Sequence, residues 1–360
     1  MSDRREINRI VLPEQPGTRP IARAGLAATP DGPLVFGPFG EGGVWTWDPR
    51  TDGFASRDLV HTGYDLHLVD YTGAHDLLYE TAFVWHEGRP LLFAGSHFDD
   101  PEEHVHDDGE EDCVDWEDED GRTEAGASVR LYDVATGELV NGPVIGHEWH
   151  VWGMAALSTP DGLLGLSGGG DGCTRAVAWN LDEGTAIGEP LTGHLDGVSA
   201  TAIALDGGRA VGLTGSHDST VRAWDMREAT EIGSAWTLPS QVRAVALSRV
   251  DGRATILAGG DFPEIHLRDL ESGEERARRI PGEGRRLSTL LTVSPGGREL
   301  VLACGYEGAV RIWDPADGSE AAAPLTAGGR LSLLAAGEVD GRVLAVTSGD
   351  GAVRLWDPFA

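Results

Sequence analysis

The sequence contains no lysine: all 28 of its basic residues are arginine, against 59 acidic residues. The absence of lysine excludes every chemistry that needs this side chain, including Schiff-base catalysis and a lysine-dependent phosphate loop. The formal net charge of −31 argues against nucleic acid and anionic membranes as general partners, because both are polyanions. We therefore expect no nucleic-acid partner and no membrane partner.

Cysteine and long apolar runs are also scarce. The three cysteines, Cys113, Cys173 and Cys304, are odd in number and far apart, so they imply no disulfide framework. Residues 1–16 include arginines but lack the apolar core of a signal peptide. The chain has no apolar stretch of the roughly 18 residues needed to span a bilayer. We expect a reduced, cytoplasmic environment.

Glycine is abundant, with 51 residues in 360, which is typical of a turn-rich β protein. One unit recurs along the chain: an alternating strand that ends in Trp-Asp or a near variant, as in AVRLWD (352–357). Five of the six spacings between successive units are 43 to 47 residues, close to the length of a four-stranded propeller blade. The anchor residues at the tryptophan position are Trp47, Tyr132, Trp179, Trp224, Arg268, Trp313 and Trp356.

A tight turn between two apolar runs is a second marker, and it also occurs seven times. Asp-Gly and Gly-Gly pairs at these turns supply the positive φ that a hairpin requires. The turn glycine precedes the anchor by 15 to 17 residues in six units and by 44 in the second, where the preceding connection is also long. One unit therefore carries two insertions, and none is missing. The turn segments are 29–36, 86–93, 159–166, 205–212, 250–257, 294–301 and 339–346.

These repeats resemble the WD-repeat β-propeller family over nearly the whole chain, and Gly146-His147 and Gly193-His194 support the resemblance. The resemblance implies an all-β, seven-bladed propeller of four-stranded blades, forming a single domain over residues 1–360. In the family, Gly-His precedes the inner strand a, the Asp-Gly turn joins strands a and b, and Trp-Asp closes strand c. Blade seven then lacks an outer strand, and we predict that the apolar segment Ile7–Leu12 supplies it and closes the ring.

The resemblance also implies a buried hydrogen-bonded network of His, Ser or Thr, Asp and Trp in the best-matching blades. Such polar groups are tolerated in a core only when they are hydrogen-bonded. We interpret the network as structural and not as a catalytic triad, because it recurs by repeat and no nucleophile elbow is present. In blade five, Phe262 and Arg268 replace the Asp and the Trp. The expected members are His147, Ser167, Asp171 and Trp179 in blade three, and His194, Thr214, Asp218 and Trp224 in blade four.

The insertion between strands b and c of blade two, residues 97–126, is strongly acidic. Between residues 99 and 124 it holds 15 carboxylates and one arginine, so it is not expected to fold alone. The simplest interpretation is a solvated, disordered loop. It is alternatively a docking segment for a basic partner, through residues such as Asp107, Asp108 and Trp116. A metal site is a further alternative, although the spacing matches no zinc or EF-hand motif; its weak candidates are His97, His104, His106 and Cys113.

The second insertion, residues 58–78, leads into strand a of blade two. In the family the d–a and b–c loops open on one face beside the central channel, so both insertions are expected to enlarge that face. Arg285 and Arg286 are expected in the d–a loop before blade six, either as ordinary solvated arginines or as a pocket for an acidic motif. Trp149 is a candidate exposed anchor on the same face.

We predict a non-enzymatic platform for protein–protein interaction, with one or more protein partners and no cofactor. The sequence has no cofactor fingerprint, phosphate loop or coherent set of metal ligands. The alternative is a ligand-binding or divalent-metal-binding propeller, possibly catalytic, that uses the His/Asp-rich insertions at the channel mouth. A third interpretation attributes the acidity and the missing lysine to salt adaptation or codon bias, and it predicts stability that rises with salt.

Overall fold

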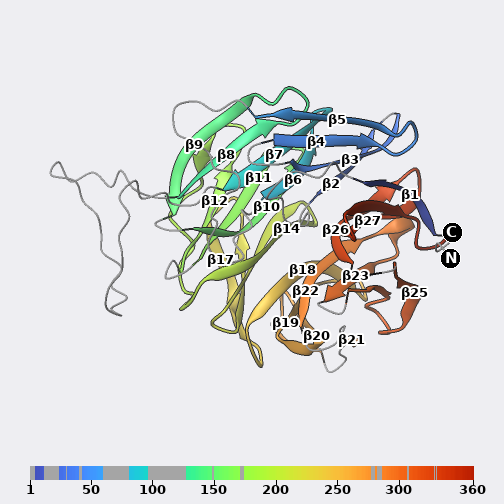
Figure 1. The fold of residues 1–360 in the computed structure, drawn as a ribbon. Helices are drawn as coiled ribbons and strands as arrows, with labels where there is room; N and C mark the ends of the chain where they lie inside the picture. Colours follow the sequence, from blue (N-terminus) through green and yellow to red (C-terminus); the bar gives the residue numbers. More distant parts are fainter. Residues whose placement is uncertain are drawn as a thin grey trace, which may run out of the picture.

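The computed structural model contains seven four-stranded antiparallel sheets. Figure 1 shows the sheets arranged around a common centre, with the colours running round the ring in chain order from blue to red. The prediction of a seven-bladed propeller is therefore confirmed. The structure describes residues 5–11, 24–29, 31–39, 43–59, 81–95, 127–147, 150–170, 174–276, 280–281, 286–305, 308–327, 329 and 331–360.

Four consecutive strands, a to d, make up each of blades one to six. Because the strands are antiparallel, the a–b and c–d turns lie at one end of a blade and the b–c and d–a connections lie at the other. We call the second end of the ring the d–a/b–c face and the first end the hairpin face. Blades one to three consist of β2 (Gly25–Thr29), β3 (Gly32–Phe39), β4 (Gly43–Asp48), β5 (Gly53–Asp58), β6 (Thr81–His86), β7 (Arg89–Gly95), β8 (Ala127–Asp133), β9 (Leu139–His147), β10 (Val151–Thr159), β11 (Gly162–Gly169), β12 (Ala176–Asn180) and β13 (Thr185–Ala186).

Blades four to six repeat this order, and a short 3-10 helix, η1 (Pro295–Gly297), forms the a–b turn of blade six. Among the described residues, no helix is both long and apolar enough to cross a membrane. The strands of these blades are β14 (Val198–Asp206), β15 (Arg209–Ser216), β16 (Thr220–Asp225), β17 (Thr230–Thr237), β18 (Val242–Val250), β19 (Arg253–Gly260), β20 (Phe262–Asp269), β21 (Ile280–Pro281), β22 (Leu287–Val293), β23 (Leu300–Gly305), β24 (Val310–Trp313) and β25 (Glu320–Leu325).

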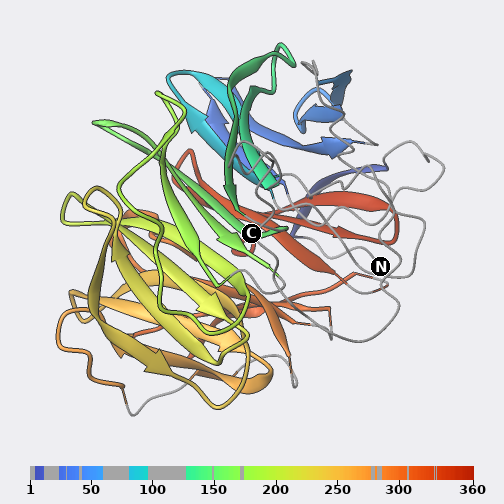
Figure 2. The same cartoon turned by 90° about the vertical axis from the view of Figure 1, so that its left-hand side faces the viewer.

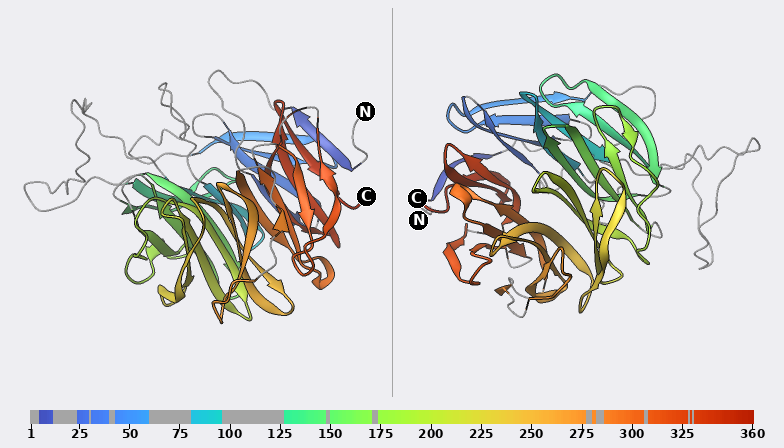
Figure 3. Two further views of the ribbon diagram at one scale, coloured as in Figure 1. Left: turned by 90° about the horizontal axis from the view of Figure 1, so that it is seen from below. Right: turned by 180° about the vertical axis from the view of Figure 1, so that it is seen from behind.

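Blade seven takes its outer strand from the beginning of the chain. Its sheet order is β1-β28-β27-β26, and Figures 1 and 3 show β1, in dark blue, beside the red strands. The pairing runs from Glu6 opposite Trp356 to Val11 opposite Ala352. The predicted closing strand is therefore confirmed, while Leu12 lies outside the described residues. The strands are β1 (Glu6–Val11), β26 (Ser332–Val339), β27 (Arg342–Gly349) and β28 (Ala352–Trp356).

Polar side chains connect this closing strand to both neighbouring blades. The Arg5 guanidinium donates hydrogen bonds to the carbonyl oxygens of Ala323 and Pro324 in blade six. Asn8 donates to the carbonyl oxygen of Pro49 in blade one at 2.6 Å. The segment thus joins blades six, seven and one.

The predicted hairpin turns have the backbone conformation that their sequence requires. Asp251 and Gly252 have φ of 54° and 76°, and Asp340 and Gly341 have φ of 51° and 74°. Two consecutive residues with positive φ form the type I′ turn, whose twist matches that of the adjoining strands. No atom lies within 4 Å of the Cβ position at Gly341. Backbone conformation alone therefore favours glycine there.

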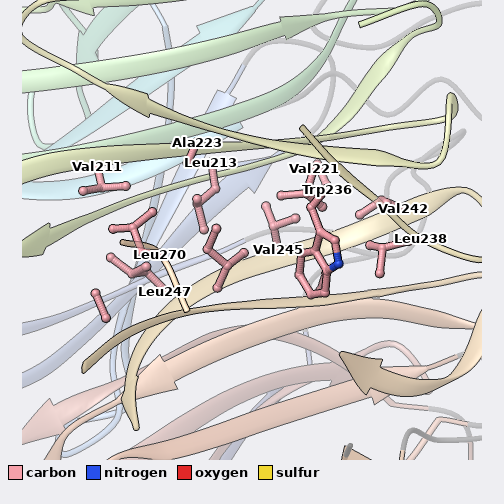
Figure 4. Close-up of a cluster of buried hydrophobic side chains, with 14 of the residues drawn as sticks. Val211, Leu213, Val221, Ala223, Trp236, Leu238, Val242, Val245, Leu247 and Leu270 are labelled. Atoms are coloured by element: carbon pink, nitrogen blue, oxygen red, sulfur yellow. The ribbon is translucent and has the colours of Figure 1, made fainter. Parts of the chain in front are cut away.

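Seven clusters of buried hydrophobic side chains fill the spaces between neighbouring blades, one cluster at each interface. Figures 2 and 3 show the sheets lying against one another by their faces. In the cluster between blades four and five, Val221 and Leu213 face Val245 and Leu247 (Figure 4). In several blades the anchor indole belongs to the cluster shared with the preceding blade; these anchors are Trp179, Trp224, Trp313 and Trp356.

Candidate functional site

A hydrogen-bonded network in blade four joins strands b and c to the loop before strand a. The Trp224 indole donates to the Thr214 hydroxyl at 2.8 Å, and that hydroxyl lies 2.8 Å from Nε2 of His194. The other ring nitrogen of His194, Nδ1, lies 3.1 Å from Asp218. The four residues predicted for this network are therefore in contact with one another.

The directions of these bonds determine the protonation of His194. An ionised Asp218 can only accept, so the single ring proton of neutral His194 is on Nδ1, and Nε2 accepts from the Thr214 hydroxyl. Burial lowers the pKa of His194, in keeping with this neutral form. Burial opposes ionisation of Asp218, but hydrogen bonds from Thr220 and from the backbone N–H of Leu195 outweigh it and hold the carboxyl pKa below its usual value. The network is a neutral imidazole on an ionised carboxylate, with no free nucleophile.

Blade three repeats most of this arrangement. The Ser167 hydroxyl accepts from the Trp179 indole at 2.8 Å and lies 2.6 Å from Nε2 of His147. Burial lowers the pKa of His147 to about 4, with a smaller contribution from the charge of Arg175. The predicted fourth member, Asp171, lies outside the described residues.

The other blades keep only parts of the network, and the hydroxyl position on strand b shows where it is lost. In blade seven Thr347 accepts from the Trp356 indole at 2.8 Å, a contact that the sequence analysis did not identify. Blade six has Ala303 at the corresponding position and blade five has Ala258. Blade five thus lacks both the hydroxyl and the indole that it would bind.

A second group of side chains lies on the d–a/b–c face. In blades three to six, strand a carries a β-bulge close to its start, and the extra residues are Trp152, Ser199, Arg243 and Ser288. A bulge leaves one residue unpaired in the ladder and often redirects its side chain. Two of these residues, Trp152 and Arg243, are large and only half-buried.

Trp152 and Arg243 belong to a row of five side chains that runs from blade three to the loop before blade six. The Trp152 ring lies 5.1 Å from the ring of His217, measured between centroids. Arg243 donates to Nε2 of His217 at 3.0 Å, and its Nε lies 3.5 Å from Asp261. Arg286 then forms two hydrogen bonds with the same aspartate, at 2.8 and 3.1 Å. We call these five residues the face row.

The face row carries a small positive charge on a strongly acidic protein. Hydrogen bonding to Arg286 and the charge of Arg243 hold the pKa of Asp261 below its usual value. One carboxylate therefore stands between two guanidinium groups. Arg286, one of the predicted candidates, already forms two hydrogen bonds with Asp261, and an incoming anion would compete with this carboxylate. The contacts therefore do not favour an anion pocket at Arg286.

An exposed leucine stands next to this row. Leu195 is 86% exposed, the largest value among the large hydrophobic residues that the structure describes. It lies in the d–a loop of blade four, where the Gly197 carbonyl accepts from the backbone N–H of His217 at 3.0 Å. The backbone N–H of Leu195 also donates to Asp218, the residue after His217, so this exposed apolar side chain belongs to the same face as the face row.

Comparisons with known proteins agree with this architecture. The WD domain, G-beta repeat model matches residues 185–225. The protein ROOT INITIATION DEFECTIVE 3 of Arabidopsis thaliana is 25% identical over 205 residues, a match that covers 52% of this chain and 44% of that protein. The chain is a WD-repeat β-propeller.

The same ring occurs among solved structures. The computationally designed Ika8 protein superposes on this propeller with a TM-score of 0.58 and 17% identity, over 98% of this chain and 99% of that one. At this identity the likeness shows the fold alone. WD-repeat propellers generally bind protein partners. In this chain the long connections lie on the d–a/b–c face.

Both insertions of this WD-repeat propeller attach to that face at blade two. Thr81, which begins β6, pairs with Ala94 at the end of β7, and Gly95 pairs with Val129 of β8. The segments before β6 and between β7 and β8 therefore leave from one end of the sheet. The predicted interaction and metal candidates that lie outside the described residues are His97, His104, His106, Asp107, Asp108, Cys113 and Trp116 in the acidic insertion, Trp149 before blade three and Arg285 before blade six.

The metal hypothesis concerns mainly the acidic insertion. Within the described ranges, no group of three or more His, Cys, Asp or Glu side chains is arranged to hold a metal ion. The four weak metal candidates all belong to the part of the chain that is not described.

The sequence analysis missed a repeated ion pair on the hairpin face of the propeller. In five blades the arginine after the turn glycine faces the aspartate of the Trp-Asp end. The signal was present in the Gly-Arg pairs of the turn segments. The pairs are Arg89–Asp133, Arg209–Asp225, Arg253–Asp269, Arg298–Asp314 and Arg342–Asp357, at 2.7 to 3.8 Å.

Proposed function

We propose that this propeller is a non-enzymatic platform that binds a protein partner on its d–a/b–c face. The observation that supports the proposal is the continuous face row, with exposed Leu195 beside it. Tryptophan and arginine are among the residue types enriched in binding hot spots, and covering a leucine that is 86% exposed removes apolar surface from water. A rigid ring presents these groups without an ordering cost.

The partner segment that fits this surface has an apolar side chain for Leu195 and Trp152 and a polar or acidic group near Arg243. The half-buried Trp152 lies so close to Gly170 that a Cβ there would sit 2.3 Å from the indole, so the ring is held on one side. A held aromatic ring loses little entropy on binding.

Single substitutions on the two faces test where the partner binds. Leu195→Ser and Trp152→Ala are compared with Leu205→Ser, because Leu205 is 42% exposed but lies near the a–b turn on the hairpin face. Each variant, after circular dichroism shows that it is folded, is used as bait in a lysate of the host at about 0.15 M salt, where exposed charges are screened beyond roughly 8 Å. We expect the two face variants to lose proteins that wild type and Leu205→Ser retain. Equal recovery by all four baits contradicts the proposed surface.

The acidic insertion is proposed as a second contact, for a basic region of the same partner. A variant with residues 99–124 replaced by a Gly/Ser linker separates the two contributions. Loss of the partner in this variant, reproduced in wild type by raising the salt, supports an electrostatic contact through the insertion. Unchanged recovery at every salt concentration restricts recognition to the face row.

A further inference from the structure

Blade five differs from its neighbours at the anchor position, where Arg268 replaces tryptophan. In blades three, four, six and seven the anchor indole packs into the cluster shared with the preceding blade. Arg268 reaches toward the same neighbour: its Nη1 donates to the carbonyl oxygen of Ser234 in blade four at 3.0 Å. Its Nε donates to the carbonyl oxygen of Gly273 at 2.8 Å. The side chain thus bridges blades four and five along its polar edges.

This bridge leaves an open pocket of about 170 Å³ between blades four and five. The equivalent space between blades two and three, where Trp179 is present, measures only about 10 Å³. Equivalent positions line the two spaces. In each, the earlier blade contributes residues of its strands c and d, and the later blade contributes its anchor residue and residues of its c–d turn. The corresponding residues are Val129 and Val221, Leu131 and Ala223, Asn141 and Ile232, Gly142 and Gly233, Trp179 and Arg268, Leu181 and Leu270, and Gly184 and Gly273.

The pocket combines a buried apolar inner wall with a mostly polar rim. Val221, Ala223 and Leu270, which belong to the buried cluster of Figure 4, form the inner wall, and Ser234, Arg268 and Ser272 belong to the polar part. Glu271 and Asp269 are also among the lining residues, and their carboxylates oppose the entry of an anion. The pocket is therefore poorly suited to phosphate or carboxylate ligands.

The contacts of the guanidinium favour an aromatic ligand. Each of the three nitrogens of Arg268 donates one hydrogen bond, to Gly273 or to the carbonyl or hydroxyl of Ser234, so the side chain is held in place. A guanidinium held in this way offers a ligand its flat face, which stacks on aromatic rings. An indole combines this flat face with an N–H donor for the polar rim.

We propose that the space between blades four and five is a binding site for an aromatic side chain, preferably tryptophan, of a partner peptide. The two interblade spaces are equivalent in position. The Trp179 indole fills the space between blades two and three, and Arg268 leaves the space between blades four and five open to an indole from a partner. The site lies beside the outer strand of blade four, away from the face row, so it goes beyond the proposed function. It gives the propeller a second point of attachment.

The test measures binding of 5-fluoroindole to the full chain by ¹⁹F NMR. For a ligand of this size a dissociation constant in the millimolar range is expected, so the titration extends to about 10 mM. Arg268→Trp fills the pocket from blade five, and Ile232→Trp fills it from blade four. We expect each variant to weaken binding at least tenfold relative to wild type.

The outcomes separate the proposal from its rivals. No saturable binding by wild type overturns it. Equal binding by wild type and both filled variants also overturns it, because the indole is then bound elsewhere. Displacement of the probe by inorganic phosphate at constant ionic strength shows that Arg268 binds anions, and this contradicts the aromatic assignment. If Arg268→Trp does not fold, Ile232→Trp alone decides the question.

Discussion

Replacing Thr214 with valine is expected to destabilise the protein by about 2 to 6 kcal/mol. The substitution keeps the volume of the side chain but removes the hydroxyl that accepts from Trp224 and donates to His194. Thr214 has no exposed surface, so no water replaces the lost partner. Each buried polar group left without a hydrogen bond costs about 1 to 3 kcal/mol. Two such groups give the expected total.

The assay is urea unfolding followed by far-ultraviolet circular dichroism, with Thr237→Val as the matched control. Thr237 is exposed on the outer strand of the same blade, and the same substitution there is expected to change the free energy of unfolding by less than about 0.5 kcal/mol. The comparison isolates the buried hydroxyl from the general effect of threonine-to-valine replacement.

A double-mutant cycle with Trp224→Phe tests the mechanism further. In that background the indole N–H is already absent, so Thr214→Val leaves only His194 unpaired and is expected to cost about 1 kcal/mol less than in wild type. Equal unfolding free energies for Thr214→Val and Thr237→Val refute the reasoning. Strict additivity in the cycle refutes the part that concerns the indole.

Three further predictions concern pH, ring closure and turns. The folded-state pKa of His147, about 4, lies below its ordinary value of 6.5, so its contribution to the free energy of unfolding is present above pH 6.5 and decreases by about 3 kcal/mol as the pH falls to 4. In this pH range the aspartates with lowered pKa have not yet lost their contribution, so His147→Asn should flatten the pH dependence of the urea midpoint. An unchanged slope contradicts this prediction. Deleting residues 1–13 should lower both the unfolding midpoint and its cooperativity, because blade seven loses β1, whereas deleting residues 1–4 is the control; a melt identical to wild type rejects β1 as the closing strand. Gly341→Ala should cost about 1 kcal/mol through backbone strain alone, since its φ is 74° and the Cβ has space; a calorimetric melt unchanged from wild type argues against the type I′ turn.

The ring was predictable because two independent sequence signals repeat with the same period. The turn glycines and the Trp-type anchors are local features, and each gives the same count of blades. The closing strand was predictable by elimination, since Ile7–Leu12 was an apolar segment without another place in a blade. Thr347 also had a recognisable signal, because it occupies the same register position as Ser167 and Thr214 in strand b.

The face row and the interblade pocket were not predictable in the same way. His217 comes from blade four and Arg243 and Asp261 from blade five, and their contacts depend on bulges and on the angle between sheets. Arg268 was recognised as a replacement for tryptophan, but nothing in the sequence shows whether a neighbour fills the space. The volumes of the two interblade spaces decide that question.

The pairing of β1 with β28 has a consequence for synthesis. Of the described strands, β1 is synthesised first and its partner β28 last. The backbone hydrogen-bonding groups of β1 therefore have no partner strand while the intervening blades are translated. Blades one to six take all four strands from consecutive chain and have no such dependence. Closing so long a loop is slow relative to local hairpins. We expect ring closure to be the last step in folding of the propeller, and a ribosome-bound chain to expose the edge of β1 until β28 has been translated.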